Sequence, residues 1–227
     1  MMMKAGYAEF VDEIVNDIIE PGVDDLLDSR YFRDLRAGKL TVRRLQGFAI
    51  QHYLHNVVVL KAFALGAIQH AATTATFLNY INAMNEELTH PEICKGFGLS
   101  LGLTEQDFED AIPVFGPLAH TAAVIHGVYL ANVPEVLANG LSNETMVQKY
   151  CTEFNDYLQK EPYGYDEDVR EFFIVHMGAD MEHTARSAKA IAELATTNLD
   201  QEKVRNVCRN MARFKLQKFE SIYDEYA

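Results

Sequence analysis

Two histidines and one aspartate lie on a single face of a predicted helix. His176, Asp180 and His183 follow one another at intervals of about one helical turn, so their side chains stack on the same side. They share that side with the apolar stripe of the helix expected from Asp166 to about Ala195. Three buried polar groups are unfavourable unless they are satisfied, and imidazole and carboxylate groups bind iron, manganese or zinc. The pattern predicts a metal site, with a metal-free His–Asp–His hydrogen-bond network as the alternative.

A second set of metal-ligand types stands in the helix expected from about Thr74 to His90. Glu87 and His90 have the Glu-x-x-His spacing that di-iron carboxylate bundles use. Glu86 is expected to face solvent, but Pro91 can distort the last turn, so Glu86 remains an alternative ligand. This short motif is common by chance, and it becomes more specific because a His/Asp/His helix accompanies it.

A bundle site takes its ligands from facing helices, so a third helix should supply another carboxylate. Glu144 flanks the apolar stripe of the helix expected from Asn143 to about Lys160. An acidic residue in a first helical turn is equally explained by the helix dipole. Periodicity alone leaves the two interpretations equal, and His126 is the candidate replacement if Glu144 is not a ligand.

These residues and their surroundings resemble one known family over most of the chain. Its other marks are three segments: Phe32–Leu40 followed by Gln51-His52-Tyr53, His90–Ile93, and Leu101–Leu103. With the His/Asp/His run, which is the most specific part, the chain resembles the haem-oxygenase-like di-metal oxidases, relatives of the thiaminase II (TenA) and pyrroloquinoline-quinone synthase C (PqqC) groups. The resemblance implies an all-α, haem-oxygenase-like bundle.

The resemblance also implies a metal-ligand set, a cofactor and a reaction. Carried over position by position, the ligands are Glu87, His90, Glu144, His176, Asp180 and His183. They would hold two iron ions, with manganese as the alternative, for a non-haem di-iron oxidase or oxygenase that uses O2. The implied substrate is a small organic molecule, fatty-acid-like or amino-acid-like, that undergoes decarboxylation, C–C cleavage or N-oxygenation. The electron donor is not indicated.

Two departures from family patterns bear on these assignments. An alignment anchored on Val133–Val136 would place Leu130 at the third carboxylate position, and we prefer Glu144 because it needs no insertion before the last motif. The thiaminase reaction requires a catalytic cysteine in a Pro-Cys pair, and the corresponding stretch here is Leu141-Ser142. Thiaminase activity is therefore excluded.

Tyr53 is the candidate catalytic residue, because a tyrosine near the metals could donate a proton or an electron. An aromatic residue on an apolar stripe is also often only part of the core. His52 and His55 lie on the same predicted helix. At least one is expected to face the cavity, but we favour a satisfied core or surface histidine for both.

Helical periodicity accounts for nearly the whole chain, and strand signals are almost absent. The patterns predict a single all-α domain over residues 1–227, with seven or eight helices. Thr41 and Thr104 are expected N-caps, and Asp166 opens the helix that carries the His/Asp/His run. Asn139-Gly140 is interpreted as a C-cap and turn between two helices. The expected helices cover residues 5–20, 41–70, 74–90, a short stretch after 104, 117–138, 143–160, 166–195 and 200 onward, and a short turn of helix covers 24–28.

Composition narrows the class of protein. The chain has 227 residues, 48% of them hydrophobic, and a formal net charge of −13. This acidity argues against a nucleic-acid partner, since binding to nucleic acid needs a basic face on the protein. The sequence also contains no basic cluster that would bind anionic lipid. No apolar run is long enough to span a membrane, no secretory signal is visible, and the three cysteines form no metal or disulfide pattern. We expect a cytoplasmic protein.

The sequence therefore predicts a cytoplasmic di-iron oxidoreductase whose partners are O2 and a small molecule, with no nucleic-acid or membrane partner. A homodimer is implied by the resemblance only, since no dimer signature is visible in the sequence. Two alternatives remain: a metal-binding or ferroxidase-like protein, and a non-catalytic TenA-like binding module. An apolar cavity beside the metals would favour the oxidase, and a wide polar channel would favour ferroxidase activity.

Overall fold

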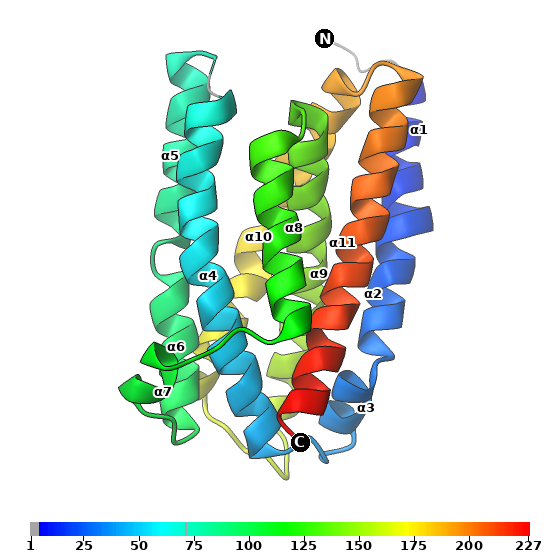
Figure 1. Ribbon diagram of the computed structural model, residues 1–227. Coiled ribbons are helices and arrows are strands. Elements are labelled where there is room, and N and C mark those ends of the chain that lie inside the picture. The colour runs from blue at the N-terminus through cyan, green and yellow to red at the C-terminus, as the bar shows by residue number, and fades with distance from the viewer. Residues whose placement is uncertain (1–4, 71) are drawn as a thin grey trace.

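The protein is a bundle of helices (Figure 1), and no strand occurs among residues 5–70 and 72–227, which the computed structural model describes. Within these ranges the side chains of residues 5–8, 75, 76, 79 and 179–183 lie outside the description. The prediction of an all-α fold is confirmed. In chain order the elements are α1 (Ala5–Ile14), the π-helical segment η1 (Val15–Ile19), α2 (Glu20–Leu27), α3 (Arg30–Arg36), α4 (Val42–His70), α5 (Thr74–Glu87), α6 (His90–Ser100), α7 (Glu105–Glu109), α8 (Phe115–Leu130), α9 (Val133–Leu158), α10 (Glu167–Leu194) and α11 (Asn198–Glu225).

The long helices run side by side along one axis of the molecule (Figure 1). α9 and α10 pack together extensively, and α11 lies against both α8 and α9. α4 contacts α5, α6 and α8, whereas α2 packs on α11. Residues from α4, α8, α9 and α10 can therefore face a common interior.

Side-chain caps fix where the site-bearing helices begin. At the start of α4, the backbone N–H of Arg44 donates to Oγ1 of Thr41 at 3.3 Å. Thr104 opens α7 with a reciprocal capping box. Asp166 accepts from the backbone N–H of Val169 at 3.1 Å, at the start of α10. All three predicted helix starts are confirmed.

The predicted turn at Asn139-Gly140 is wrong, because α9 continues through it. The helix begins instead at Asn132, whose side chain accepts from the backbone N–H of Glu135 at 3.1 Å, while the Glu135 carboxylate accepts from the backbone N–H of Asn132. This capping box sets the start, and packing outweighs the low helix propensity of glycine. Glu144 consequently stands in the middle of a long helix, so the helix dipole does not account for it.

Two helices lie outside the expected set, α3 and α6. α5 ends at Glu87 and α6 begins at His90, so the helix is interrupted at Leu88-Thr89. Pro91 sits in the first turn of α6, where its missing N–H is harmless. The expected kink is therefore a full break, which puts Glu87 at the end of one helix and His90 at the start of the next.

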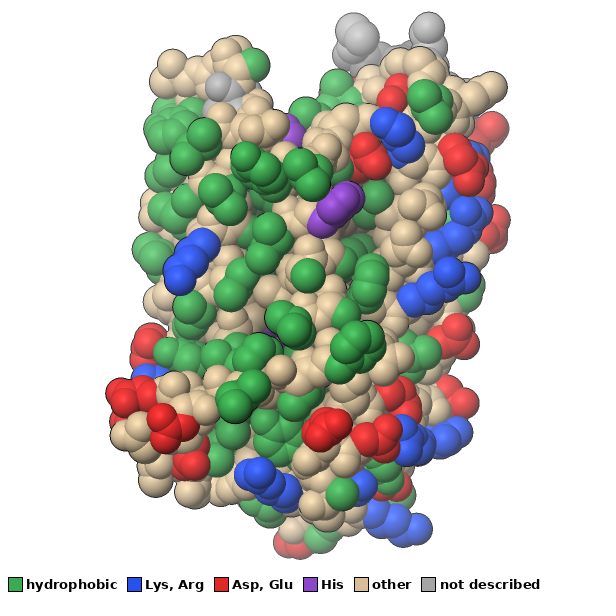
Figure 2. Space-filling model, viewed as in Figure 1, with side chains coloured by type: hydrophobic (Ala, Val, Ile, Leu, Met, Phe, Trp, Pro, Cys, Tyr) green, Lys and Arg blue, Asp and Glu red, His purple; other side chains and the backbone are tan. Residues whose placement is uncertain are grey.

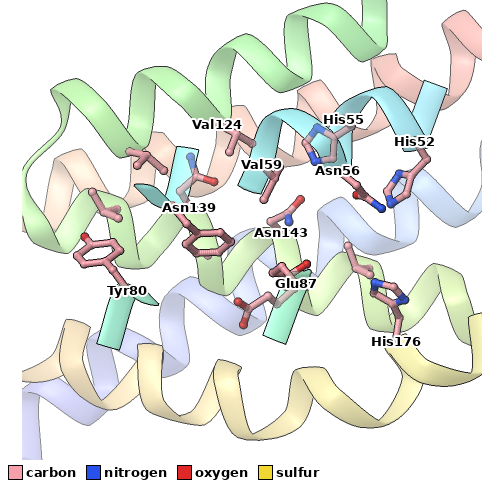
Figure 3. Close-up of a pocket in the computed structure, with 16 residues that line it drawn as sticks. His52, His55, Asn56, Val59, Tyr80, Glu87, Val124, Asn139, Asn143 and His176 are labelled. Atoms are coloured by element: carbon pink, nitrogen blue, oxygen red, sulfur yellow. The ribbon is translucent and has the colours of Figure 1, made fainter. Parts of the chain in front are cut away.

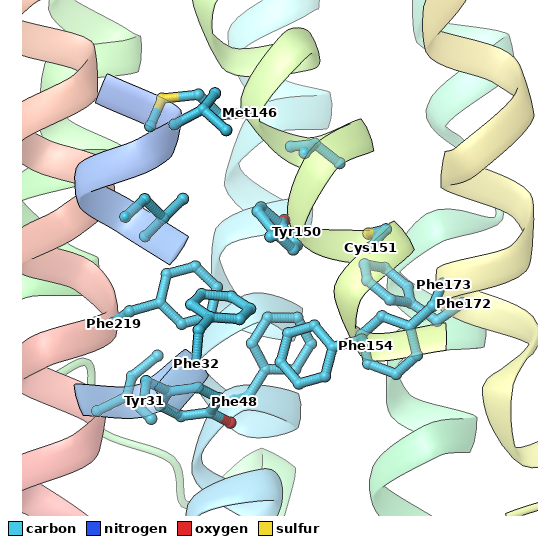
Figure 4. Packing of buried hydrophobic residues seen from close by; sticks show 14 of the residues in the cluster. Tyr31, Phe32, Phe48, Met146, Tyr150, Cys151, Phe154, Phe172, Phe173 and Phe219 are labelled. Atoms are coloured by element: carbon cyan, nitrogen blue, oxygen red, sulfur yellow. The ribbon is translucent and has the colours of Figure 1, made fainter. Parts of the chain in front are cut away.

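An aromatic cluster from five helices fills the core next to α3 (Figure 4). The ring centroid of Phe154 on α9 lies 4.9 Å from that of Phe48 on α4 and 4.4 Å from that of Phe173 on α10. Phe32 of α3 and Phe219 of α11 complete the group, with centroids 4.8 Å apart. These side chains are fully buried, and replacing such a ring by alanine removes about 3–5 kcal/mol of stability. The cluster therefore fixes the separation of α4, α9, α10 and α11.

Charged side chains are unevenly spread over the surface. Residues 111–134, which include α8, contain no Asp, Glu, Lys or Arg. On the face viewed in Figure 2, hydrophobic side chains occupy the centre and most charged ones lie toward the lower and right-hand margins. Ile112 and Phe115 are 79% and 73% exposed. No helix in the described part of the chain is both long and apolar enough to cross a bilayer.

Candidate metal centre

A cavity of about 140 Å³ lies between α4, α5, α8, α9 and α10 (Figure 3). Three of the predicted ligands, Glu87, Glu144 and His176, line it. The structure thus brings together residues from three helices that are far apart in the sequence. The other lining residues are polar (His52, His55, Asn56, Asn139, Asn143), aromatic (Phe63, Tyr80) or aliphatic (Val59, Val124, Val128, Val136, Val147), with Gly140 among them.

Glu87 and His90 form a bonded pair across the break between α5 and α6. Oε2 of Glu87 accepts a hydrogen bond from Nδ1 of His90. Because Nδ1 is engaged by a carboxylate, Nε2 is the ring nitrogen left for a metal, an arrangement common for histidine ligands. Glu86 is exposed and lies 4.0 Å from Arg186. Of the two neighbouring glutamates, Glu87 is the one that lines the cavity.

His176 lies beside this pair, with its ring centroid 4.3 Å from that of His90. Nδ1 of His176 donates to the backbone carbonyl oxygen of Phe172 at 2.6 Å, so Nε2 keeps the lone pair that a metal would bind. Burial, with a smaller contribution from His90, lowers the pKa of His176 to about 4. The imidazole is therefore neutral at neutral pH, the form in which histidine binds metals.

Glu144 reaches the cavity from α9. Its Oε1 lies 3.9 Å from the position that a Cβ on Gly140 would take, one turn earlier. Glycine at that position leaves space beside the carboxylate. Carboxylates from α5 and α9 and imidazoles from α6 and α10 thus gather in one region, and this donor set fits a transition-metal centre.

Asp180 and His183 follow His176 on α10, and the backbone of all three residues is helical. The side chains of Asp180 and His183 lie outside the described residues. Among the side chains that are described, no group of three or more His, Cys, Asp or Glu residues is placed to hold a metal ion. The participation of Asp180 and His183 therefore stays a prediction.

Three other sequence candidates lie away from the cavity. Tyr53 packs against Phe108, with ring centroids 5.1 Å apart, and it does not line the cavity. His126 is exposed on α8, and Leu130 is 67% exposed at the end of that helix. The geometry therefore gives no support to a catalytic role for Tyr53 or a ligand role for His126.

A buried basic cluster that was not predicted from the sequence lies behind the cavity wall. Lys215 and Lys218 of α11 are completely buried. Nζ of Lys215 donates to Oδ1 of Asn143, and Nζ of Lys218 bonds to Nδ1 of His52. Lysines at core positions are rare, so the apolar stripe of α11 is the sequence signal that could have revealed them. It places the two lysines at helical spacing among Val204, Cys208, Met211, Phe219 and Ile222.

Burial also sets the protonation of the histidines around the cavity. Desolvation, with a smaller contribution from Lys218, lowers the pKa of His52 and of His55 well below the ordinary value. Desolvation likewise lowers the pKa of His120 and, with the help of Lys215, that of Lys218. A neutral imidazole has one donor and one acceptor nitrogen. Hydrogen bonds therefore decide what each ring offers to the cavity.

Sequence comparison identifies the family to which the chain belongs. The sequence profile described as "iron-containing redox enzyme" matches residues 46–215, a span that contains every predicted ligand. The chain belongs to the iron-containing redox enzyme family. It is also similar to two proteins named 4-aminobenzoate synthase. One, from Chlamydia pneumoniae, is 27% identical over 191 residues, covering 78% of this chain and 81% of the relative. The other, from Chlamydia trachomatis serovar D, is 27% identical over 216 residues, covering 89% and 87%.

Solved structures share the fold of this iron-containing redox enzyme family member. A domain of unknown function with a heme oxygenase-like fold from Shewanella denitrificans has a TM-score of 0.84 at 18% identity, covering 95% of this chain and 93% of its own. A TenA homologue from P. horikoshii has a TM-score of 0.76 at 19% identity, covering 95% and 98%. At such identities the likeness shows the fold alone. The predicted haem-oxygenase-like fold is confirmed.

Proposed function

We propose that this chain is a non-haem di-iron oxidase or oxygenase that uses O2 to oxidise a small organic molecule. The observation that carries the proposal is the meeting of Glu87, Glu144 and His176 on one cavity. His90 supports it, since it is bonded to Glu87 and lies beside His176. Membership of the iron-containing redox enzyme family supports iron as the metal. The proposal of two ions rests on the full predicted set, which adds Asp180 and His183.

Three of the four described ligands are oriented by a neighbour. The carbonyl oxygen of Phe172 fixes the ring of His176, and Glu87 and His90 orient each other. Such contacts set the direction and basicity of ligands in metal sites. The carboxylates of Glu87 and Glu144 would offset the charge of the metal ions. When bound, iron supplies O2 activation and electron transfer, which amino-acid side chains do not provide.

The cavity supports an organic substrate rather than iron storage. Its wall combines five valines and two aromatic rings with eight polar or ionisable side chains, and small-molecule sites likewise join apolar walls to polar groups that orient the ligand. A ferroxidase would need a polar route for ions. The volume of about 140 Å³ is close to the roughly 150 Å³ of a cavity that binds benzene. The molecule, or the part of it that reacts, is therefore small.

Iron analysis after anaerobic loading with Fe(II) tests the proposal. We expect two iron ions per wild-type chain and at most one in Glu144→Gln, which keeps the shape of the side chain but removes its charge. Glu87→Gln should also lower the iron content. Glu86→Gln is the matched control, because Glu86 is the exposed neighbour of Glu87, and it should keep two ions.

The iron content of these variants tests separately whether the protein binds iron and which glutamates are ligands. A folded wild-type protein that binds no iron would overturn the di-iron proposal. Two ions retained by Glu144→Gln would remove Glu144 from the ligand set. Loss of iron in Glu86→Gln but not in Glu87→Gln would reverse the choice between these two glutamates.

O2 consumption by the iron-loaded protein identifies the substrate class. Fatty acids and amino acids are supplied in parallel with a reductant, and the names of the two chlamydial relatives make 4-aminobenzoate a product to measure. We expect one class to accelerate O2 uptake, and His176→Gln to abolish that acceleration. Fe(II) oxidation that no organic compound accelerates would favour the ferroxidase alternative.

A further inference from the structure

Two side chains of α4 lie one helical turn apart on the cavity wall, His52 and Asn56 (Figure 3). His52 is 3% exposed and Asn56 is 9% exposed. Polar groups this deeply buried are normally hydrogen-bonded within the protein. The bonds that each one makes therefore show what it leaves for a bound molecule.

The amide nitrogen of Asn56 has no hydrogen-bond partner among the described residues. A buried N–H group without a partner is unfavourable. Because Asn56 lines the cavity, an oxygen atom of a molecule in the cavity would satisfy this donor.

The ring of His52 is held from behind by Lys218, whose Nζ bonds to Nδ1 of the ring. A lysine amine has N–H groups to donate whether it is charged or neutral. With Lys218 as the donor, Nδ1 is the acceptor, and the ring hydrogen of the neutral imidazole stands on Nε2. The Nε2–H group is therefore the one that His52 offers to the cavity.

His55, on the same helix, is bonded in the opposite sense. Its Nδ1 lies 2.8 Å from Oγ1 of Thr121, and that hydroxyl already donates to the carbonyl oxygen of Pro117 at 2.9 Å. His55 is therefore the donor to Thr121, and its Nε2 keeps a lone pair. The two N–H donors facing the cavity on α4 thus belong to His52 and Asn56.

We propose that His52 and Asn56 form a donor pair that binds a carbonyl or carboxylate oxygen of the substrate, with Lys218 fixing the orientation of His52. Val59 and Phe63 continue the wall along α4, so the bound molecule carries its oxygen on a small apolar body. Calling that molecule the substrate rests on the proposed function, whereas the binding itself does not require iron.

Binding of a neutral ketone to the iron-free protein tests the donor pair. Acetophenone carries an acceptor oxygen, and ethylbenzene has nearly the same shape without one. Neutral probes avoid repulsion by the carboxylates of Glu87 and Glu144. Ligand-observed NMR titrations should show tighter binding of acetophenone. Asn56→Leu should reduce the ratio of the two affinities by about fivefold, a typical loss for one hydrogen bond.

Three further variants separate hydrogen bonding from packing. Val59→Ala, one turn further along α4, should weaken both probes and leave the ratio of their affinities unchanged. Asn56→Asp replaces a donor by an acceptor, so it should weaken acetophenone and favour the cation 1-phenylethylamine. Lys218→Met should also reduce the ratio, because His52 loses the partner that holds its ring. Circular dichroism checks that each variant is folded.

Three results would overturn the donor pair: equal wild-type affinity for acetophenone and ethylbenzene, no detectable acetophenone binding, or a ratio that neither Asn56 variant changes. A wild-type protein that prefers the ketone but binds no iron would overturn the proposed function and leave the donor pair standing. Iron binding without ketone preference would overturn the donor pair alone.

Discussion

The aromatic cluster and the cavity share three helices, α4, α9 and α10. On α4, Phe48 belongs to the cluster and His52 to the cavity wall, and their rings stack with centroids 5.0 Å apart. On α10, Phe172 also belongs to the cluster, with its ring centroid 5.3 Å from that of Phe173, and it lies 4.3 Å from the ring of His176. The change from packing to polar chemistry therefore takes place within a single helical turn.

The two regions differ in what burial does to their stability. The cluster removes large apolar rings from water, which is favourable. The cavity removes imidazole, amide and carboxylate groups from water, which is unfavourable unless each finds a partner. α4, α9 and α10 are fixed by the cluster and hold in place the cavity residues that they carry, so the site does not need to stabilise itself.

The largest effect is expected in the cluster, for Phe154→Ala. Phe154 is fully buried, and removing such a ring leaves a cavity that should lower the free energy of unfolding by about 3–5 kcal/mol. Urea denaturation measures the change. Ile112→Ala, at an exposed site, is the control and should change it by less than about 0.5 kcal/mol. A loss below about 1 kcal/mol for Phe154→Ala would show that the cluster is not the main source of stability.

Acid should destabilise the cavity region of the iron-free protein. The pKa of His176 is about 4 in the folded state and about 6.5 in the unfolded chain. The unfolded state therefore binds more protons between these values, and the free energy of unfolding falls as the pH drops through the window, by up to about 1.4 kcal/mol per pH unit for this histidine.

Urea denaturation from neutral pH down to the folded pKa checks this expectation. His176→Leu cannot take up the proton, so its stability should fall less steeply than that of the wild type. The difference between the two curves isolates His176 from the other buried histidines. Parallel curves would mean that His176 does not carry the predicted linkage.

A smaller effect is expected at the cap that starts α9. Asn132→Ala removes the acceptor for the backbone N–H of Glu135 and should reduce the free energy of unfolding by about 1 kcal/mol. Asn206→Ala, at an exposed position inside α11, makes the same substitution without touching a cap. A cap variant as stable as the Asn206 variant would show that packing alone positions this end of the cavity wall.

The smallest effect is expected for Tyr53→Phe. Tyr53 packs outside the cavity against Phe108, so loss of its hydroxyl should change the free energy of unfolding by less than about 0.5 kcal/mol. Iron content and substrate-dependent O2 uptake should match those of the wild type. A loss of O2 uptake with normal iron content would return Tyr53 to the catalytic residues and move the boundary of the site.

The sequence predicts the parts of the structure that depend on local patterns. Helix periodicity and side-chain caps such as Thr104 and Asp166 locate most helices correctly. The error at Asn139-Gly140 arises because a glycine that ends many helices is tolerated here within the packed interior of α9. Local signals could not choose between the two outcomes, since the capping box at Asn132 and packing along the whole helix decide it.

Site residues could be predicted from the sequence only where they follow one another at helical spacing. Glu87, His90 and His176 could be proposed from their intervals along the chain. The placement of His52 beside Lys218 could not be predicted, because it joins α4 to α11 across 166 positions of the sequence. Asn56 carries no motif at all, and only its unsatisfied amide in the folded chain marks it.

The break between α5 and α6 gives the site a mechanical property. Glu87 ends α5, which packs extensively on α4, whereas His90 begins α6, which is braced by both α4 and α10. Because Glu87 stands next to this hinge, a tilt of α5 about Leu88-Thr89 displaces Glu87 less than Tyr80, which lies two turns further away, while His90 keeps its place. Such a tilt would therefore move the part of the cavity wall that α5 contributes through Tyr80, and leave the bonded pair of Glu87 and His90 nearly unchanged.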